Sequence, residues 1–233
     1  MTTTILNIQE PEKRTTTEKA SLEVVDIFHT IQGEGPFSGA RAIFIRLAGC
    51  NLQCPGCDTD YTTDRKEMDL LDISNDVANL GLPPHLVVIT GGEPFRQNIS
   101  MLVNTLIATG YTVQIETNGT VPPSKGLSRD AVIVCSPKTA RINNVLGMRA
   151  NCFKYVIHAD SVDTDGLPIK ALDNWANPRV GRPPKGASNM IYVQPMDCQD
   201  PVQNELNVQE CVSSCITHGY LLQLQIHKLV GVA

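Results

Sequence analysis

The 233-residue sequence has no long apolar run and no excess of basic residues. A helix that crosses a bilayer needs about 18 consecutive apolar residues, and no such stretch occurs, so we expect no membrane span. Residues 1–20 lack the apolar core of a secretory signal, and we therefore expect a cytoplasmic protein. The net charge of −5 argues against a protein that binds nucleic acid by neutralising phosphates.

The composition is typical of one globular domain. Hydrophobic residues make up 42% of the chain and charged residues 18%, which is enough to build a single core. Residues 1–20 are rich in Thr, Glu and Lys and predict a frayed or loosely docked polar tail ahead of a domain over residues 21–233. Within that domain, the stretch 161–189 combines several prolines with scattered charges and predicts an irregular insertion.

Segments typical of strands alternate with segments typical of helices along the chain. Such alternation predicts a mostly parallel sheet with helices packed on it. A complete (β/α) barrel needs about 250 residues, so we predict an α/β fold of the partial (β/α) barrel type, with about six parallel strands and the insertion before the last strands. The predicted strands are 22–28, 41–47, 85–90, 111–116, 131–135, 152–157, 190–194 and 220–226, and the predicted helices are 70–80, 95–109 and 201–218.

Two of the predicted strands carry polar residues at every second position. Gln114, Glu116 and Asn118 share one face of the first, and residues 223, 225 and 227 share one face of the second. These faces either point to solvent at a sheet edge or line a polar cavity at the carboxyl ends of the strands. In barrel folds, substrates bind at the carboxyl ends of the strands.

Three of the eight cysteines, Cys50, Cys54 and Cys57, fall in one loop with the spacing CxxxCxxC. A structural zinc site needs four protein ligands, usually as two pairs, and no second pair has suitable spacing. Cys211 and Cys215 lie four residues apart on a predicted helix, which is more typical of a buried stripe. Three thiolates can instead hold a [4Fe–4S] cluster and leave the fourth iron without a protein ligand. We favour the cluster over zinc, and over disulfides in a reducing compartment.

The cysteine pattern is followed by Gly91-Gly92-Glu93-Pro94 at the end of the predicted strand 85–90. Together the two motifs resemble the radical S-adenosylmethionine (SAM) superfamily. The resemblance implies that the fourth iron binds the amino and carboxylate groups of SAM and that electron transfer cleaves SAM to a 5′-deoxyadenosyl radical. Glycine at these positions would let the backbone approach the ligand, and Glu93 could pair with the SAM ammonium.

Further segments resemble one family within that superfamily, the 7-carboxy-7-deazaguanine synthases. The resemblance implies ring contraction of 6-carboxy-5,6,7,8-tetrahydropterin to 7-carboxy-7-deazaguanine with loss of ammonia, with SAM used catalytically and Mg²⁺ as a further cofactor. The segments that carry it are Ile31-Gln32-Gly33-Glu34-Gly35, Arg41 to Leu47, Cys57-Asp58-Thr59, Glu116-Thr117-Asn118-Gly119, Ser136-Pro137-Lys138, Phe153 to Val156, Gln194-Pro195-Met196-Asp197 and the C-terminal Gln225-Ile226-His227-Lys228.

The resemblance also implies roles for individual residues. Cys50, Cys54 and Cys57 would hold the cluster, and Thr59 would give an oxygen ligand to Mg²⁺, which prefers oxygen donors. The residues that match SAM contacts are Gly56, Cys57, Asp58, Gly92, Glu93, Glu116, Ser136, Pro137, Lys138 and Gln194. The residues that match substrate contacts are Ile31, Gln32, Gly33, Arg46, Thr90, His227 and the C-terminal carboxylate on Ala233.

The chemistry of the side chains agrees with several of these roles. Arg46 is a natural bidentate partner for the substrate carboxylate. Glu116 or Gln114 could meet the amino-pyrimidinone edge of a pterin, although Glu116 could serve SAM instead. His227 could orient the substrate or pair with a backbone carbonyl. Lys154 and His158 share a face if the alternation of the predicted strand 152–157 continues to residue 158, and they receive no role.

Three functions remain open on the sequence. The first is the deazaguanine-forming enzyme, with a small-molecule substrate, a flavodoxin or ferredoxin as electron donor and a homodimeric assembly, all implied by the resemblance. The second is another radical SAM enzyme, such as an activase that abstracts hydrogen from a glycine of a partner protein. The third is a non-catalytic protein that binds an iron–sulfur cluster or zinc. No contact with nucleic acid or a membrane is expected.

Overall fold

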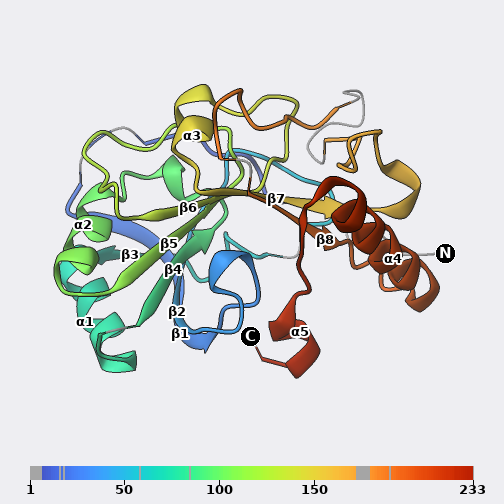
Figure 1. Ribbon diagram of the computed structural model, residues 1–233. Helices are drawn as coiled ribbons and strands as arrows, with labels where there is room; N and C mark the ends of the chain where they lie inside the picture. The colour runs from blue at the N-terminus through green and yellow to red at the C-terminus, as the bar shows by residue number, and fades with distance from the viewer. Residues whose placement is uncertain are drawn as a thin grey trace.

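The computed structural model describes residues 7–232 except 16, 18, 58, 84, 172–178 and 189 (Figure 1). Within the described part the strands form one mixed sheet in the order β3-β1-β2-β4-β5-β6-β7-β8-β9. From β2 to β9 every neighbouring pair is parallel, whereas β1 pairs antiparallel with both β2 and β3. The sheet is open, with β3 and β9 at its edges, and the α/β prediction is confirmed.

The strands and helices follow one another along the chain as predicted for a βα fold. The strands are β1 (Ser21–Ile31), β2 (Arg41–Leu47), β3 (Lys66–Asp69), β4 (Leu86–Gly91), β5 (Thr112–Thr117), β6 (Val132–Cys135), β7 (Cys152–Ile157), β8 (Ile191–Pro195) and β9 (Leu221–Leu222). The α-helices are α1 (Leu70–Leu80), α2 (Ser100–Ala108), α3 (Asn144–Arg149), α4 (Pro201–His218) and α5 (Ile226–Val230), with short 3₁₀ turns η1 (Gly35–Phe37), η2 (Pro94–Arg96) and η3 (Ala159–Ser161).

The helices that cover the sheet begin and end where local chemistry permits. In α4 the Asp200 carboxylate caps the amino end by accepting hydrogen bonds from the N–H groups of Val202 and Gln203, and Pro201 occupies the first turn. The same helix ends at Gly219, whose φ of 75° is readily adopted only by glycine. Figure 1 shows α1 and α2 near one end of the sheet and α4 beside β8 near the other.

Alternate residues of the strands point to two different faces of the sheet. On one face, which we call the apolar face, Ile45, Ile89, Ile115 and Phe153 are fully buried and pack with apolar residues of α1, α2 and α4. The opposite face, which we call the polar face, carries a smaller apolar cluster built around Ala42, Leu86 and Val88. Period-two alternation therefore separates a structural core from a polar surface on the same strands.

The predicted strand over 220–226 is wrong beyond its first residues. β9 is only two residues long, and the chain then turns into the short helix α5, so His227 lies in a helix and not in a strand. Gln223 is 3% exposed and its side-chain oxygen accepts a hydrogen bond from the Gly35 N–H at 2.7 Å, whereas Leu222 and Leu224 are partly exposed. The alternating pattern does place the glutamine inward, and the Gln223 N–H still pairs with the Val193 carbonyl of β8 at 2.9 Å before the chain leaves the sheet.

The structure also contradicts the prediction of a frayed or loosely docked tail over its described residues. The Glu12 N–H donates to the Cys50 carbonyl at 2.7 Å, and the Thr15 N–H donates to the Arg96 carbonyl at 2.8 Å. A polar sequence gives no hydrophobic signal of docking, because these contacts are made by the backbone and by polar side chains.

β3, α3 and α5 are further elements that the sequence pattern did not predict.

The described part of the insertion, residues 161–171 and 179–188, contains no α-helix and no strand of the sheet, and only its first residue, Ser161, belongs to the 3₁₀ turn η3. It is nevertheless closed on itself: the Val180 N–H donates to the Ile169 carbonyl at 2.9 Å. Arg182 binds both carboxylate oxygens of Asp165, at 2.7 and 2.9 Å, and anchors the two halves to each other. Hydrogen bonds therefore order the insertion where periodic structure does not.

No cysteine forms a disulfide, and all eight lie in the described part of the chain. No helix among the described residues is long and apolar enough to cross a membrane.

Candidate active site

The cysteine loop follows β2 directly and is closed at its base by a buried tyrosine. The Gly49 N–H donates to the Tyr61 carbonyl at 2.9 Å, so the chain returns to the end of β2 after residue 61. Tyr61 is 1% exposed, and its hydroxyl donates to the Leu52 carbonyl at 3.3 Å inside the loop. We call residues 49–61 the cluster loop.

Within the cluster loop Cys50 is buried, whereas Cys54 and Cys57 are partly exposed. The Leu52 N–H donates to the Cys50 sulfur at 3.4 Å, and the Asn118 amide approaches the same sulfur at 3.9 Å. Burial raises the pKa of the Cys50 thiol to about 12, so metal coordination is what would hold it as a thiolate.

The arrangement of the thiols bears on the choice between zinc and a cluster. Among the described residues no three His, Cys, Asp or Glu side chains converge as ligands of one metal ion. Thiolates that each bind a different iron of a cube lie farther apart than thiolates around a single ion. Three cysteines in one loop, without a second pair of suitable spacing, remain the observation that favours a cluster over zinc.

The glycines after β4 press against the cluster loop. A Cβ on Gly92 would lie 2.1 Å from the Gly49 carbonyl oxygen and 2.8 Å from the Cys50 Cβ, so only glycine fits there. A Cβ on Gly91 would lie 2.1 Å from the Leu47 carbonyl oxygen, and its φ is 134°. This close approach brings the Gly-Gly-Glu-Pro turn to the cysteines, as the two motifs together imply.

Glu93 is fully buried and its carboxylate is already hydrogen-bonded within the protein. One oxygen accepts from the Thr117 hydroxyl at 2.8 Å and the Phe95 N–H at 3.0 Å, and the other accepts from the Asn118 N–H at 2.8 Å. Burial raises the pKa of Glu93 to about 7, against the lowering effect of these three donors. Glu93 thus ties the turn after β4 to the end of β5, and its predicted contact with SAM remains a prediction.

A second group of polar residues lies on the polar face at the carboxyl ends of β2, β4 and β5. Arg46 and Thr90 are register partners on β2 and β4, and the Thr90 hydroxyl donates to Glu116 on β5 at 3.2 Å. The amides of Gln32 and Gln114 donate to the other oxygen of Glu116, at 2.9 and 3.0 Å. Arg46 also stacks its guanidinium over the Phe28 ring at 5.5 Å. The structure therefore brings together side chains predicted to bind the substrate.

Glu34, from the Gln32-Gly33-Glu34-Gly35 segment, forms the deepest charged contact on this face. Its carboxylate pairs with the Lys154 ammonium on β7 and accepts a hydrogen bond from the Gln225 amide at 2.7 Å. Burial alone would raise the pKa of Glu34, but Lys154 and Gln225 outweigh it and hold this pKa well below its usual range. Lys154, left without a role by the sequence, thus has a structural one.

The C-terminal segment lies against the same face, where α5 packs on β1 (Figure 1). The His227 ring packs so tightly on Gly33 that a Cβ there would lie 1.8 Å from Nδ1. His227 therefore reaches the predicted substrate residues, although it does so from a helix. Ile31 ends β1 just before them.

Three buried polar oxygens along β5, β6 and β8 point to a bound group. The Gln114 and Gln194 amide oxygens and the Ser136 hydroxyl are buried and have no hydrogen-bond partner among the described residues. Buried polar atoms without a partner are costly, so a polar ligand such as SAM would satisfy them. Gln194 and Ser136, followed by Pro137 and Lys138, are residues that match SAM contacts in the sequence.

The remaining predicted residues are not all placed. Gly56 has a φ of 68° in the cluster loop, and Thr59 lies just after Cys57, where its carbonyl accepts from the Gln9 amide at 3.0 Å. Asp58 and Ala233 lie outside the described residues. Sequence reasoning did not predict that Glu34, Gln223 and Gln225 contribute to one connected group of polar contacts. The alternation of polar and apolar residues over 222–227 was the signal available for Gln223 and Gln225.

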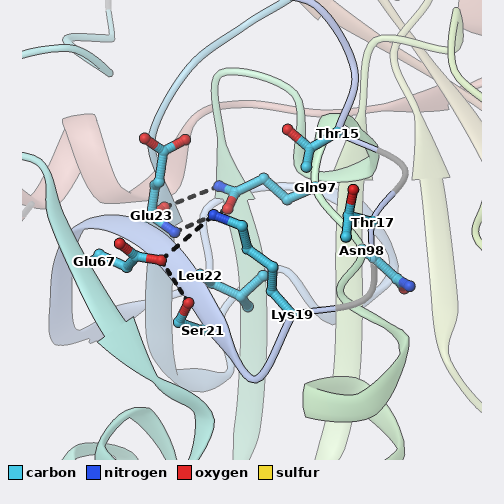
Figure 2. A pocket seen from close by; sticks show the side chains of 9 residues that line it. All are labelled: Thr15, Thr17, Lys19, Ser21, Leu22, Glu23, Glu67, Gln97 and Asn98. Carbon is cyan, nitrogen blue, oxygen red and sulfur yellow. Dashed lines mark hydrogen bonds and ion pairs between the residues drawn. The ribbon is translucent and has the colours of Figure 1, made fainter.

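A separate cavity of about 70 Å³ lies where the start of β1 meets β3 (Figure 2). In its wall the Gln97 amide donates a hydrogen bond to the Glu23 carbonyl at 2.9 Å. Lys19 and Ser21 both bind the Glu67 carboxylate. Its lining contains no cysteine and no residue of the polar face, so we assign it no part in the chemistry.

Three comparisons with known proteins agree with one another. Residues 44–130 match the family model described as the radical SAM superfamily. The chain is 42% identical over 226 residues to the 7-carboxy-7-deazaguanine synthase of Rhodospirillum rubrum, covering 91% of this chain and 93% of the relative. It is 39% identical over 222 residues to the enzyme of the same name from Rickettsia prowazekii, covering 91% and 88%. The solved structure of QueE from Escherichia coli superposes with a TM-score of 0.67 at 25% identity, covering 88% of this chain and 94% of that one.

Proposed function

Because the chain belongs to the 7-carboxy-7-deazaguanine synthase family of radical SAM enzymes, we propose that it contracts the ring of 6-carboxy-5,6,7,8-tetrahydropterin. The product is 7-carboxy-7-deazaguanine, a 7-deazapurine, and ammonia is lost. The observation that carries this proposal is the convergence of the cluster loop, the Gly-Gly-Glu-Pro turn and the polar face at the carboxyl ends of the same parallel strands. Substrates of such folds bind at these ends.

The cluster loop would hold a [4Fe–4S] cluster through Cys50, Cys54 and Cys57. When bound together, the cluster and SAM supply the 5′-deoxyadenosyl radical. The chain's own contribution begins with the backbone: Gly92 lets the turn after β4 approach the Cys50 side of the loop. Ser136 and Gln194 would then orient SAM with buried polar atoms that lack protein partners.

The polar face would bind the pterin. Arg46 would take the substrate carboxylate in a bidentate contact, with its guanidinium held in place by the Phe28 ring. Glu116, oriented by Thr90, Gln32 and Gln114, would accept hydrogen bonds from the amino-pyrimidinone edge. Since three donors fix both of its oxygens, this carboxylate is preorganised before the substrate arrives.

The C-terminal segment would close over the substrate bound on the polar face and exclude water from the radical intermediate. His227 packs on Gly33, and Gln225 binds Glu34, which supports this role. Deletion of residues 229–233 should weaken substrate binding and leave the cluster in place. Unchanged turnover in that truncated protein would contradict the closing role.

Mg²⁺ and protein partners complete the proposal. An oxygen of Thr59 and the substrate carboxylate are suitable ligands for a hard cation, and such an ion would hold the substrate in one conformer. We also propose a flavodoxin or ferredoxin as the electron donor and a homodimer as the working assembly, both on the basis of the family.

The direct test is a turnover assay. The protein would be purified without oxygen, its cluster rebuilt with iron and sulfide, and the enzyme incubated with SAM, a strong reductant, Mg²⁺ and 6-carboxytetrahydropterin. We expect mass spectrometry to detect 7-carboxy-7-deazaguanine while SAM is not consumed. Cleavage of SAM without that product would keep the radical chemistry and reject the substrate. A Cys54→Ala variant is the control, because it removes one cluster ligand.

A further inference from the structure

Residues 7–15, which we call the N-terminal strap, run along the cluster loop and bind its backbone. The Glu12 N–H donates to the Cys50 carbonyl at 2.7 Å. The Asn7 amide donates to the Cys54 carbonyl at 3.2 Å and approaches the buried Tyr61 hydroxyl at 3.4 Å. Two of the three cysteines predicted to bind the cluster therefore have their carbonyls fixed by the strap.

Gln9 binds the part of the cluster loop that follows the third cysteine. Its side-chain nitrogen donates to the Thr59 carbonyl at 3.0 Å. Its side-chain oxygen accepts from the Tyr61 N–H at 2.8 Å and from the Thr62 hydroxyl at 3.2 Å. One amide thus replaces the pairing that a neighbouring strand would give to this irregular stretch of backbone.

Glu12 connects the strap to the second half of the site. Its carboxylate pairs with Arg65, just beyond the cluster loop, and with Arg96 at 3.1 Å, just beyond the Gly-Gly-Glu-Pro turn. Arg96 is 3% exposed and also donates to the Ala48 carbonyl at 3.0 Å, immediately before the loop. The strap therefore links the cluster loop to the turn that would bind SAM.

Residues that face the protein alternate with exposed residues along the start of the strap. Asn7 is buried and Gln9 half-buried against the loop, whereas Ile8 is 81% exposed and Glu10 is exposed. Alternate residues of an extended segment point to opposite sides. The polar amides, and not the isoleucine, face the protein, so recognition of loop carbonyls explains the docking and burial of apolar surface does not.

We propose that the N-terminal strap holds the cluster loop in the conformation that retains the iron–sulfur cluster, with Gln9 as its main positioning residue. The proposal deepens the proposed function and rests on it. The cluster loop has no helix or strand among its described residues, so its thiols depend on outside contacts for their positions. Hydrogen-bond partners of a metal-binding shell commonly change metal affinity by about 10- to 100-fold when removed.

The test compares the isosteric variant Gln9→Glu with the neighbouring Glu10→Gln. In Gln9→Glu a carboxylate oxygen faces the Thr59 carbonyl, so the donor is lost while the shape is kept. Each holoenzyme, rebuilt without oxygen, would be exposed to excess iron chelator and the loss of cluster absorbance followed. We expect Gln9→Glu to lose its cluster about 10- to 100-fold faster than wild type, and Glu10→Gln to match wild type. Hydrogen exchange of the Cys57 amide, which donates to the Cys54 carbonyl inside the cluster loop, should accelerate among the iron-free proteins only in Gln9→Glu, because the loop is no longer held at Thr59.

Two results would overturn the proposal in distinguishable ways. If wild type takes up no cluster, the proposed function fails and the role of the strap fails with it. If wild type holds a cluster that Gln9→Glu loses no faster than Glu10→Gln does, the strap has no such role and the proposed function stands. Asn7→Ala, which removes the bond to the Cys54 carbonyl, gives a second variant should Gln9→Glu not fold. It should show the same acceleration.

Discussion

The apolar and polar faces of the sheet are built from alternate residues of the same strands, yet they are stabilised in different ways. On β2, Ile45 is fully buried among other apolar side chains, whereas its neighbour Arg46 stacks on Phe28 and stays accessible. On β5, Ile115 belongs to the core, whereas Glu116 collects hydrogen bonds from three other residues. The apolar face is stabilised by removal of surface from water. The polar face depends on hydrogen bonds and ion pairs between specific partners.

The largest stability loss should come from the polar face, when one member of its buried ion pair is removed. Lys154→Met leaves the Glu34 carboxylate buried without its ammonium partner, and we expect the free energy of unfolding to fall by about 3–5 kcal/mol. Urea unfolding of the iron-free protein would measure it. The double variant Lys154→Met/Glu34→Gln should recover at least half of the loss. A double variant as unstable as the single one would mean that packing, and not the unpaired charge, explains the effect.

The apolar face should respond to a change in volume. Ile45→Ala removes fully buried methyl groups and should lower the free energy of unfolding by about 2–5 kcal/mol, and Ile45→Val by about 1 kcal/mol. The same urea experiment serves, with turnover per folded molecule measured alongside. We expect that turnover to be unchanged. A large drop in turnover for Ile45→Val would contradict the separation of the two faces.

Arg46 should respond in catalysis and hardly in stability. Arg46→Lys keeps the charge but loses the planar fork, and kcat/KM for the pterin should fall by about 10- to 100-fold. Steady-state assays of the rebuilt enzyme would show the effect, and Arg41→Lys at the opposite end of β2 is the matched control. Equal rates for the two variants would argue against a carboxylate contact by Arg46.

The smallest expected effect is on the pH dependence of stability. The folded-state pKa of Glu34 lies below its unfolded value of 4.5, so its contribution is present above that pH and is lost as the pH falls further. Between about pH 6 and about pH 3.5, the iron-free wild type should lose more free energy of unfolding than Glu34→Gln does. If the free energy of unfolding changes with pH by the same amount in the two proteins, then Lys154 and Gln225 do not stabilise the ionised form of Glu34.

Much of the apolar face could be predicted from the sequence, because it rests on local periodicity. The predicted helix 70–80 coincides with α1, whose Ile73 and Val77 lie four residues apart and face the core. β2, β4 and β7 begin and end within a residue of their predictions. Strand propensity and alternation suffice where burial against helices is the main determinant.

The polar site could be predicted only by motif, and its connections could not. Glu34 and Lys154 are 120 residues apart, and no local pattern indicates that they pair. His227 lies against Gly33, but in a helix and not in the predicted strand, because its position depends on contacts with a segment far earlier in the chain. The N-terminal strap was missed because its docking uses hydrogen bonds, for which sequence alone gives no periodic signal.

The hydrogen bond between Val180 and Ile169 has a consequence for the cooperativity of the insertion. The Arg182–Asp165 pair joins the same two described halves a second time. Bringing two distant parts of a chain together carries an entropic cost that grows only slowly with the length between them, by about 0.6 kcal/mol for each doubling. Because that cost is met once, each of the two contacts makes the other easier to form, and loss of either should weaken both.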